Sequence, residues 1–167
     1  MVLELHVHSL LGNSTIPLLA ETEMESMESQ MNTKTQKVMF SSASGNWITP
    51  PDFYKKLDEE FHFDFDPCPY PLPAWDGLQV DWGQRNYVNP PYGREISKWI
   101  WKAHEEWCQG KTVVMLLPAR TDTKWFHHWI VNQAEIRFIR GRLKFLSPDG
   151  KVMNSAPFPS MVVIFRQ

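Results

Sequence analysis

Disulfide pairs, membrane-spanning stretches and export signals are missing from this sequence of 167 residues. Its two cysteines, Cys68 and Cys108, lie far apart and form no paired framework, which excludes a disulfide-stapled secreted scaffold. No apolar run approaches the length needed to span a bilayer, and the first residues lack the basic start and unbroken apolar core of a signal peptide. We therefore predict a protein of the reducing cytoplasm.

A strong charge bias and a set of metal ligands are also missing. The net charge of -2 gives no overall attraction to a polyanion, so any contact with nucleic acid must come from a local basic patch. His104 and Cys108 have a helical spacing, and His127 and His128 follow, but these residues do not make four ligands at a recognised spacing. We therefore predict no metal site.

Aromatic residues, by contrast, are unusually abundant. Eight Trp and ten Phe can build a small, dense core, or some of them can serve as platforms on which bases stack. The length suits one domain. Residues 1–43 are polar and dotted with methionines, which predicts a flexible tail in which Met31 or Met39 is an alternative start. Residues 44–167 form the predicted domain.

Hydrophobic periodicity and capping signals predict alternating helices and strands. Thr49 is placed to cap a helix that has Pro50 at its first position and ends near Glu60. The continuous apolar run over 112–117 is typical of a strand buried on both faces of a parallel sheet. Further strands are predicted over 61–65, 85–88, 135–140, 141–145 and 161–166, and further helices over 95–109 and 123–131. This order predicts an α/β three-layer sandwich with a mostly parallel sheet and an antiparallel strand at the C-terminus.

One predicted strand-to-helix corner carries the sequence Asn89-Pro90-Pro91-Tyr92-Gly93. In an open α/β sheet, ligands bind beyond the carboxyl ends of the strands. The Asn89 carboxamide oxygen and the Pro90 carbonyl make a rigid pair of acceptors suited to an NH2 group, and Tyr92 offers a flat face to a ring. The alternative is a proline-rich turn capped by Asn89, with no site.

Six segments resemble those of one enzyme family, in the same order. They are Gly45-Asn-Trp-Ile-Thr49-Pro50, Asp66-Pro67-Cys68, Asn89-Pro-Pro-Tyr92-Gly-Arg-Glu95, Leu117-Pro-Ala-Arg120-Thr-Asp122-Thr, Arg137-Phe-Ile-Arg140-Gly-Arg142-Leu-Lys144-Phe145 and Ala156-Pro-Phe158-Pro-Ser160. From about Met39 to its C-terminus, the chain resembles the N6-adenine DNA methyltransferases, and most closely the small Dam-like enzymes encoded by phages. The resemblance implies a Rossmann-like fold, S-adenosylmethionine as methyl donor and adenine in DNA as acceptor. A phage protein of this kind would act in the host cytoplasm.

The resemblance implies that the catalytic residues are Asn89, Pro90, Pro91 and Tyr92. An exocyclic amine on a purine is a poor nucleophile because its lone pair is delocalised into the ring. If Asn89 and the Pro90 carbonyl each accept one N–H, they localise that lone pair toward the methyl group. Tyr92 would stack on an adenine flipped out of the duplex. Phe145 would form the opposite wall, with Phe158 as the competing candidate and plain core packing as the alternative for both.

The resemblance places the cofactor contacts at Thr49, Pro50, Asp66, Pro67, Cys68, Asp76, Asp81 and Asn89. Asp66 would meet the methionine ammonium or a ribose hydroxyl, although an Asx turn before Pro67 is the alternative. The turn at Thr49 would help to close over the cofactor. Asp76 and Asp81 are both candidates for the cofactor's adenine or ribose, and the choice between them stays open.

Two departures from the family pattern concern this cofactor half. Familiar methyltransferases have a glycine-rich loop after the first strand, but prolines and Cys68 follow Asp66 instead. The segment from Asp66 to Arg85 is also too short for two further strand–helix crossovers, each of which needs about a dozen residues. We therefore expect a reduced sheet, in which the loop 76–82 or the neighbouring subunit of a homodimer substitutes.

Basic residues near the C-terminus are candidates for contact with DNA. Arg140, Arg142 and Lys144, together with Arg137, form a local cluster that suits phosphate, with protection of an edge strand as the alternative. Arg120 and Asp122 follow a strand and are further candidates, although the alternative is a helix cap by Thr121 or Asp122 with Arg120 on the surface.

Two alternative functions remain at this stage. An NH2 grip suits RNA or a glutamine amide as well as DNA adenine. A DNA-binding derivative that has lost turnover is the alternative outside the enzymes.

Overall fold

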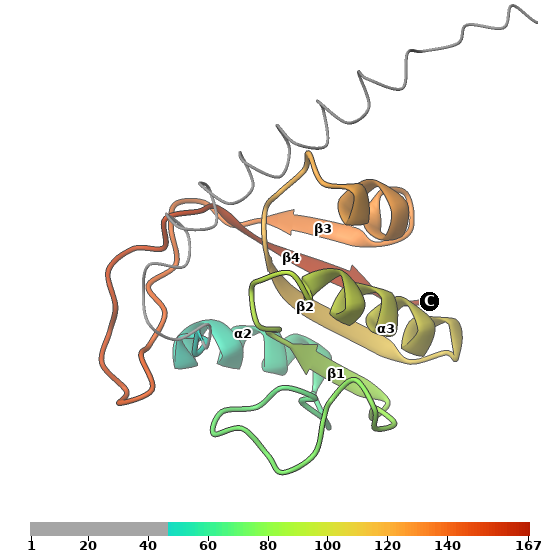
Figure 1. The fold of residues 1–167 in the computed structure, drawn as a ribbon, viewed down its shortest axis with the longest axis horizontal. Coiled ribbons are helices and arrows are strands. Elements are labelled where there is room, and N and C mark those ends of the chain that lie inside the picture. Colours follow the sequence, from blue (N-terminus) through green and yellow to red (C-terminus); the bar gives the residue numbers. More distant parts are fainter. Residues whose placement is uncertain (1–46) are drawn as a thin grey trace, which may run out of the picture. The chain divides into compact units, whose positions relative to one another are not determined.

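The computed structural model describes residues 47–167 (Figure 1). Its elements are α2 (Pro51–Phe61), β1 (Arg85–Val88), α3 (Ile96–Cys108), β2 (Thr112–Pro118), the π-helix η1 (Phe126–Ile130), β3 (Glu135–Phe138) and β4 (Ser160–Phe165). The predicted tail over 1–43 lies outside the described residues. The division of the chain at residue 44 therefore stays a prediction.

The four strands form one mixed sheet in the order β1-β2-β4-β3. β1 and β2 pair in parallel, whereas β4 runs antiparallel to both of its neighbours, β2 and β3. The predicted antiparallel strand at the C-terminus is confirmed. Because this strand lies inside the sheet, two of the three strand pairs are antiparallel. The prediction of a mostly parallel sheet was therefore wrong.

Helices cover both faces of this sheet. Tyr87 of β1 meets Tyr54 of α2 edge-on, with ring centroids 5.0 Å apart. Phe165 of β4 packs against Trp107 of α3 at 5.7 Å. Phe165 shares a register with Asn86, the neighbour of Tyr87, and successive side chains of a strand point to opposite faces. The two helices therefore lie on opposite faces, as a three-layer arrangement requires.

The core is densest at the two central strands. Val113 to Leu117 of β2 are fully buried, and every residue of β4 is buried. Burial on both faces explains the continuous apolar run of β2, because a strand between two helical layers has no solvent side. α3 contacts both strands and lies in front of them in Figure 1. None of the helices in the described part of the chain is long and apolar enough to cross a bilayer.

Sequence reasoning placed the end of α2 within one residue of Phe61, but it was wrong about the start of the helix and about the strand predicted after it. Pro50 occupies the N-cap position, and no side chain caps the helix. Thr49 does not cap it because its hydroxyl is bound to Tyr87 of β1 instead, at 2.7 Å. The predicted strand over 61–65 is absent, since Phe61 is still helical and His62 ends the helix with a left-handed backbone at φ 52°. Only Phe65 forms a bridge to the sheet.

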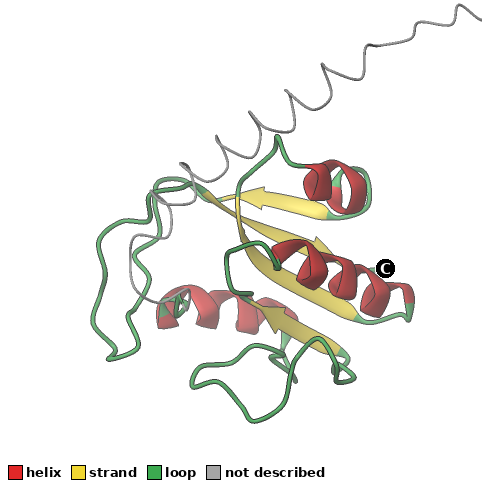
Figure 2. Cartoon of the chain, in the orientation of Figure 1, coloured by secondary structure: helices red, strands yellow, loops and turns green. Residues whose placement is uncertain are grey.

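The connection from α2 to β1, residues 62–84, is almost wholly loop (Figure 2). No strand–helix crossover occurs in it, so the expected reduction of the sheet is confirmed. The predicted helix over 123–131 is present over residues 124–130, of which the π-helix η1 makes up the larger part. The predicted strand over 141–145 is absent, and only Leu146 pairs there, through isolated bridges to Ile48 and Val152.

Candidate active site

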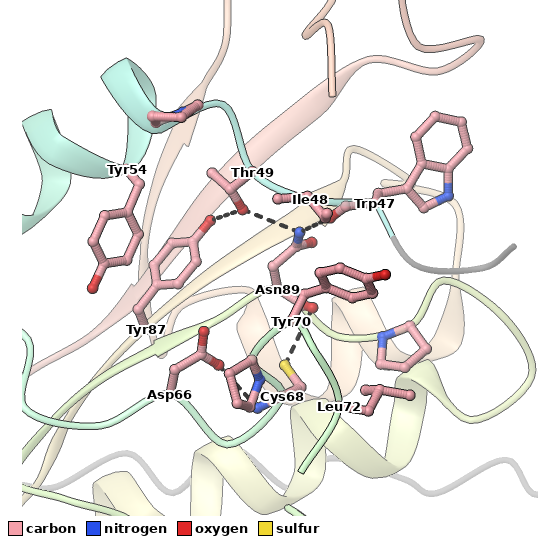
Figure 3. Close-up of a pocket in the computed structure, with 13 residues that line it drawn as sticks. Trp47, Ile48, Thr49, Tyr54, Asp66, Cys68, Tyr70, Leu72, Tyr87 and Asn89 are labelled. Carbon is pink, nitrogen blue, oxygen red and sulfur yellow. Dashed lines mark hydrogen bonds between the residues drawn. The ribbon is translucent and has the colours of Figure 1, made fainter. Parts of the chain in front are cut away.

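A cavity of about 290 Å³ lies at the carboxyl end of β1 (Figure 3). The segment before α2, the loop after Phe65 and the corner after β1 form its walls. Its lining residues are Trp47, Ile48, Thr49, Pro51, Tyr54, Asp66, Cys68, Pro69, Tyr70, Leu72, Tyr87, Asn89 and Pro91. Three segments that the sequence analysis singled out separately therefore meet in one place.

Asn89 lines this cavity and carries an unused, buried acceptor. Its Nδ2 donates to the Trp47 carbonyl at 2.5 Å and to Oγ1 of Thr49 at 3.1 Å. Its Oδ1 is buried and accepts no hydrogen bond from residues 47–167. A carboxamide has two N–H donors, and both are engaged here, so its oxygen is the free end. A buried acceptor without a partner costs about 1–3 kcal/mol, which a ligand's N–H would recover.

The two prolines differ in their positions. Pro91 lines the cavity, whereas Pro90 is buried behind it. The Pro90 carbonyl accepts no hydrogen bond from the described residues. Its part as the second acceptor of the pair stays a prediction.

Tyr92 is not at the surface of the cavity. Only 4% of the side chain is exposed, and its hydroxyl donates to the Leu116 carbonyl of β2 at 3.1 Å. The ring meets Phe158 edge-on at 5.4 Å and Phe145 at 6.3 Å, and Trp47 contacts both phenylalanines. The structure thus brings the three predicted base-pocket rings together, but as a packed cluster, so the core-packing alternative describes this conformation.

Asp66 lies at the cavity wall and also forms the predicted Asx turn. Its Oδ1 accepts from the backbone N–H of Cys68 at 2.9 Å. Burial raises the pKa of the Asp66 carboxyl to about 6, from an ordinary value of 3.8, because the charged form loses water. A cation placed in the cavity would stabilise the ionised form and lower this pKa.

Cys68 links the Asp66 loop to the corner after β1. Its thiol donates to the Asn89 backbone carbonyl at 3.2 Å. Burial raises the pKa of this thiol well above its usual range, so it stays protonated and acts as a donor. The two cavity walls are therefore joined through one sulfhydryl hydrogen bond.

Several predicted cofactor residues are not in the cavity wall. Pro50 and Pro67 are adjacent to lining residues without lining it themselves, and Asp76 and Asp81 are exposed elsewhere on the loop. Asp76 accepts from the backbone N–H of Leu78 at 2.9 Å. The structure does not bring either aspartate to Asn89.

Arg120, which is half-buried, and Asp122, which is exposed, lie in the turn after β2 and do not line the cavity. The turn is closed by the hydroxyl of Thr123, which donates to the Arg120 carbonyl at 2.8 Å. Asp122 does not cap the helical segment over residues 124–130, because its side chain forms no hydrogen bond to the start of that segment. The helix-cap reading of Asp122 was therefore wrong.

The basic cluster is smaller than the sequence indicates. Arg137 forms a paired contact with Glu60 of α2, at 2.6 and 2.7 Å, and a third with Glu135 at 2.6 Å. These carboxylates neutralise it, so Arg137 is a weaker candidate for phosphate than the other three residues of the cluster. Arg140, Arg142 and Lys144 are exposed and form no ion pair within residues 47–167.

Eight lining residues were not predicted as site residues: Trp47, Ile48, Pro51, Tyr54, Pro69, Tyr70, Leu72 and Tyr87. Tyr87 looked like part of an apolar strand, and Tyr54 looked like an ordinary residue of a helix. Tyr70 and Leu72 lie in a proline-rich loop without a motif. A large side chain exposed in such a loop, as Tyr70 and Leu72 are at 44% and 62%, becomes a signal only when its position is known. Residues 47–167 contain no group of three potential metal ligands.

Comparison with known proteins shows which family the chain belongs to. A family model described as "DNA N-6-adenine-methyltransferase (Dam)" matches residues 32–167. The chain belongs to this family. It is accordingly an adenine-specific DNA methyltransferase, and the resemblance in the sequence to phage Dam-like enzymes is confirmed.

Two curated relatives of this Dam-family chain come from phages. The "DNA N-6-adenine-methyltransferase" of Haemophilus phage HP1 is 29% identical over 133 residues, which cover 71% of this chain and 77% of the relative. The protein of the same description from Escherichia phage T1 is 33% identical over 104 residues, covering 52% of this chain and 43% of that longer protein. The T1 match therefore leaves more than half of that relative uncovered.

Proposed function

We propose that this Dam-family enzyme transfers a methyl group to N6 of an adenine in DNA at the cavity formed by residues 47–91, with S-adenosylmethionine as donor. The unpartnered, buried Oδ1 of Asn89 is the observation that carries this proposal. An acceptor held in a cavity, with its amide nitrogen already engaged, suits an exocyclic NH2 group. The position beyond the carboxyl end of a parallel strand supports a Rossmann-like assignment of the fold.

The cavity suits the chemistry of the donor. Asp66 supplies a desolvated carboxylate for the methionine ammonium, and this pairing would reverse the cost of its burial. Tyr54 and Tyr70 supply apolar ring faces on the same cavity. S-adenosylmethionine supplies an electrophilic methyl group. Asp76 and Asp81 are weaker candidates for its ribose, since they lie outside the lining.

The protein's own part in the reaction is to prepare the amine. Oδ1 of Asn89 and the Pro90 carbonyl each accept one N–H of the adenine N6 group, which localises its lone pair. A methyl donor held beside Asp66 would supply the methyl group by cleavage of its carbon–sulfur bond, and the methylated nitrogen would give up one proton to water. No covalent bond to the enzyme is required.

The aromatic cluster must open for Tyr92 to stack on a flipped base. In the packed cluster, Phe145 and Phe158 meet the ring of Tyr92 edge-on. Base stacking contributes about 1–3 kcal/mol, which offsets part of the contacts that the ring gives up. Arg140, Arg142 and Lys144, on the segment that carries Phe145, supply phosphate contacts, with Arg120 and Asp122 as further DNA contacts. Action in the host cytoplasm and a homodimer remain predictions.

Transfer of labelled methyl groups to unmethylated plasmid DNA tests this function. We expect label in N6-methyladenine, and loss of label with Asn89→Ala when the variant retains its folded circular-dichroism spectrum. Parallel reactions contain RNA and a glutamine-containing protein. Label confined to RNA or protein would favour the broader amine-methylating alternative, and DNA binding without any label would favour a derivative that has lost turnover.

A further inference from the structure

The carboxamide of Asn89 is held by a network that begins before α2. Trp47 and Thr49 belong to this segment, and Tyr87 belongs to β1 (Figure 3). Oγ1 of Thr49 lies 2.7 Å from the Tyr87 hydroxyl and 3.1 Å from Nδ2 of Asn89. Thr49 is thus the middle member of a chain of three polar side chains.

We propose that Thr49 and Tyr87 are positioning residues that hold the Asn89 carboxamide with its oxygen toward the substrate amine. The inference rests on the proposed function, because it assigns a task to the same amide. Neither residue touches the reacting atoms. Their effect is exerted through the orientation of Asn89.

The orientation of the amide follows from what each partner is able to do. The Trp47 carbonyl only accepts, so a flipped amide would place two acceptor oxygens 2.5 Å apart. Thr49 is different, because a hydroxyl donates or accepts equally well. Whichever hydroxyl donates in the contact between Thr49 and Tyr87, the Thr49 oxygen keeps a lone pair that accepts from Nδ2 of Asn89.

The segment that carries Thr49 is itself anchored on its other side. Ile48 and Leu146 exchange two backbone hydrogen bonds, of 3.2 and 2.9 Å. Burial raises the pKa of the Tyr87 hydroxyl far above its usual range, so it remains a neutral hydrogen-bonding group at working pH. The network is therefore fixed at both ends, and a loss at Thr49 or at Tyr87 should misplace the same oxygen.

The test is a cycle of Thr49→Val, Tyr87→Phe and the double variant, with Thr49→Ser as the conservative change. Thr112→Val is the matched control, because it removes a hydroxyl of the same type at the start of β2, outside the cavity lining. Single-turnover methylation is measured with saturating plasmid and S-adenosylmethionine. Affinity is measured separately by calorimetry with S-adenosylhomocysteine as the probe.

We expect Thr49→Val to slow methylation by about 10–100-fold, since a misplacement of about 1 Å costs on that order. The double variant should be no slower than the slower single variant, because both changes release one amide. Thr49→Ser and Thr112→Val should stay within about threefold of wild type, as should the affinity of Thr49→Val for S-adenosylhomocysteine.

Three results would overturn the proposal. A loss of S-adenosylhomocysteine affinity that matches the loss of rate would make Thr49 a direct cofactor contact. Rate losses that multiply in the double variant would make Thr49 and Tyr87 independent. An unchanged methylation rate in Thr49→Val would show that the Trp47 carbonyl alone fixes the orientation of the Asn89 amide. If Tyr87→Phe does not fold, the proposal is still tested by the difference in methylation rate between Thr49→Val and Thr49→Ser and by the affinity of Thr49→Val for S-adenosylhomocysteine.

A readout without catalysis separates this inference from the proposed function. The side-chain NH2 protons of Asn89 should both give hydrogen-bonded shifts in ¹⁵N NMR spectra of wild type, and one should move upfield in Thr49→Val. Inactive wild-type protein with these signals would sink the proposed function and leave the network intact. Active wild-type protein, together with unchanged Asn89 signals in Thr49→Val, would support the proposed function and contradict the positioning role of Thr49.

Discussion

Asn89 and Tyr92 belong to one corner of the chain, yet they lie in opposite states. Both N–H groups of the Asn89 amide are engaged, and its oxygen is unpartnered within residues 47–167. Tyr92 has a packed ring and a bonded hydroxyl. The polar half of the corner therefore keeps an unused acceptor in this structure, whereas the aromatic half is packed closed.

The difference follows from what each group gains without a ligand. A large ring gains roughly 1.5–3 kcal/mol by burial, and each well-placed aromatic pair adds about 0.5–1.5 kcal/mol, so Tyr92 packs inward. Oδ1 of Asn89 has no hydrogen-bond donor among the described residues, since the contacts of this side chain, to Trp47 and Thr49, are made by its amide nitrogen. The unsatisfied oxygen of Asn89 can thus be recognised in the free protein, whereas the ring face of Tyr92 is covered by its packing partners.

Breaking the polar half should have the largest effect. Asn89→Ala removes the acceptor and should lower the methylation rate by about 10²–10³-fold, as is usual for loss of one group that stabilises a transition state. Single-turnover kinetics with labelled donor measures this. A rate within tenfold of wild type would mean that the Pro90 carbonyl alone suffices, and that the free oxygen does not define the site.

Asp66 tests the polar half through pH. Its folded-state pKa of about 6 exceeds its ordinary value of 3.8, so Asp66 favours folding most below pH 4, and this advantage disappears as pH rises through 6. Asp66→Asn should therefore be more stable than wild type at pH 7.5 by roughly 1–3 kcal/mol, with the gap closing toward pH 4. Urea unfolding at pH 4, 6 and 7.5 measures it. A variant that is less stable at pH 7.5 would show that the Cys68 contact outweighs desolvation.

Cofactor affinity provides a second test of Asp66. If its carboxylate pairs with the methionine ammonium, binding of S-adenosylhomocysteine should weaken as pH falls below about 6, because the protonated carboxyl loses the ion pair. Asp66→Asn should bind weakly without that pH dependence. An identical pH profile for the two proteins would remove Asp66 from the site.

Tyr92→Phe sharpens the aromatic half. It keeps the ring and removes the hydrogen bond to the Leu116 carbonyl, so unfolding in urea should become easier by about 1 kcal/mol. Methylation should stay within about threefold, because a phenyl ring stacks on a base as well. Phe145→Leu, inside the same cluster, is the comparison for packing alone. A large loss of rate in Tyr92→Phe would assign the hydroxyl a chemical role.

The smallest effects are expected from the basic residues beside the aromatic half. Arg142→Ala should lower the slope of log affinity against log salt by about 1, since it removes one phosphate contact. Arg137→Met should leave that slope unchanged, because Glu60 and Glu135 already neutralise the guanidinium. Filter binding across a salt series measures both. Equal slopes for the two variants would place the DNA elsewhere.

Much of this architecture follows from local patterns in the sequence. The apolar run of β2, the amphipathic period of α3 and the proline corner after β1 lie where the sequence indicates. These signals are local, because the burial of a strand or a helix face is written in the spacing of neighbouring side chains. The same spacing placed Asn89 and Asp66 at chain segments that meet in one cavity.

Tertiary structure alone decided which polar and aromatic groups meet. Thr49 binds Tyr87 instead of capping α2, Arg137 pairs with Glu60, and β4 inserts between β2 and β3. Each outcome is a choice between a local partner and a distant one of similar chemistry. Residue type sets which bonds a side chain is able to form, but only the folded chain brings one particular partner within reach. That is why the sequence predicts Asn89 as an acceptor for an NH2 group, but does not predict the hydrogen bonds that hold its amide in place.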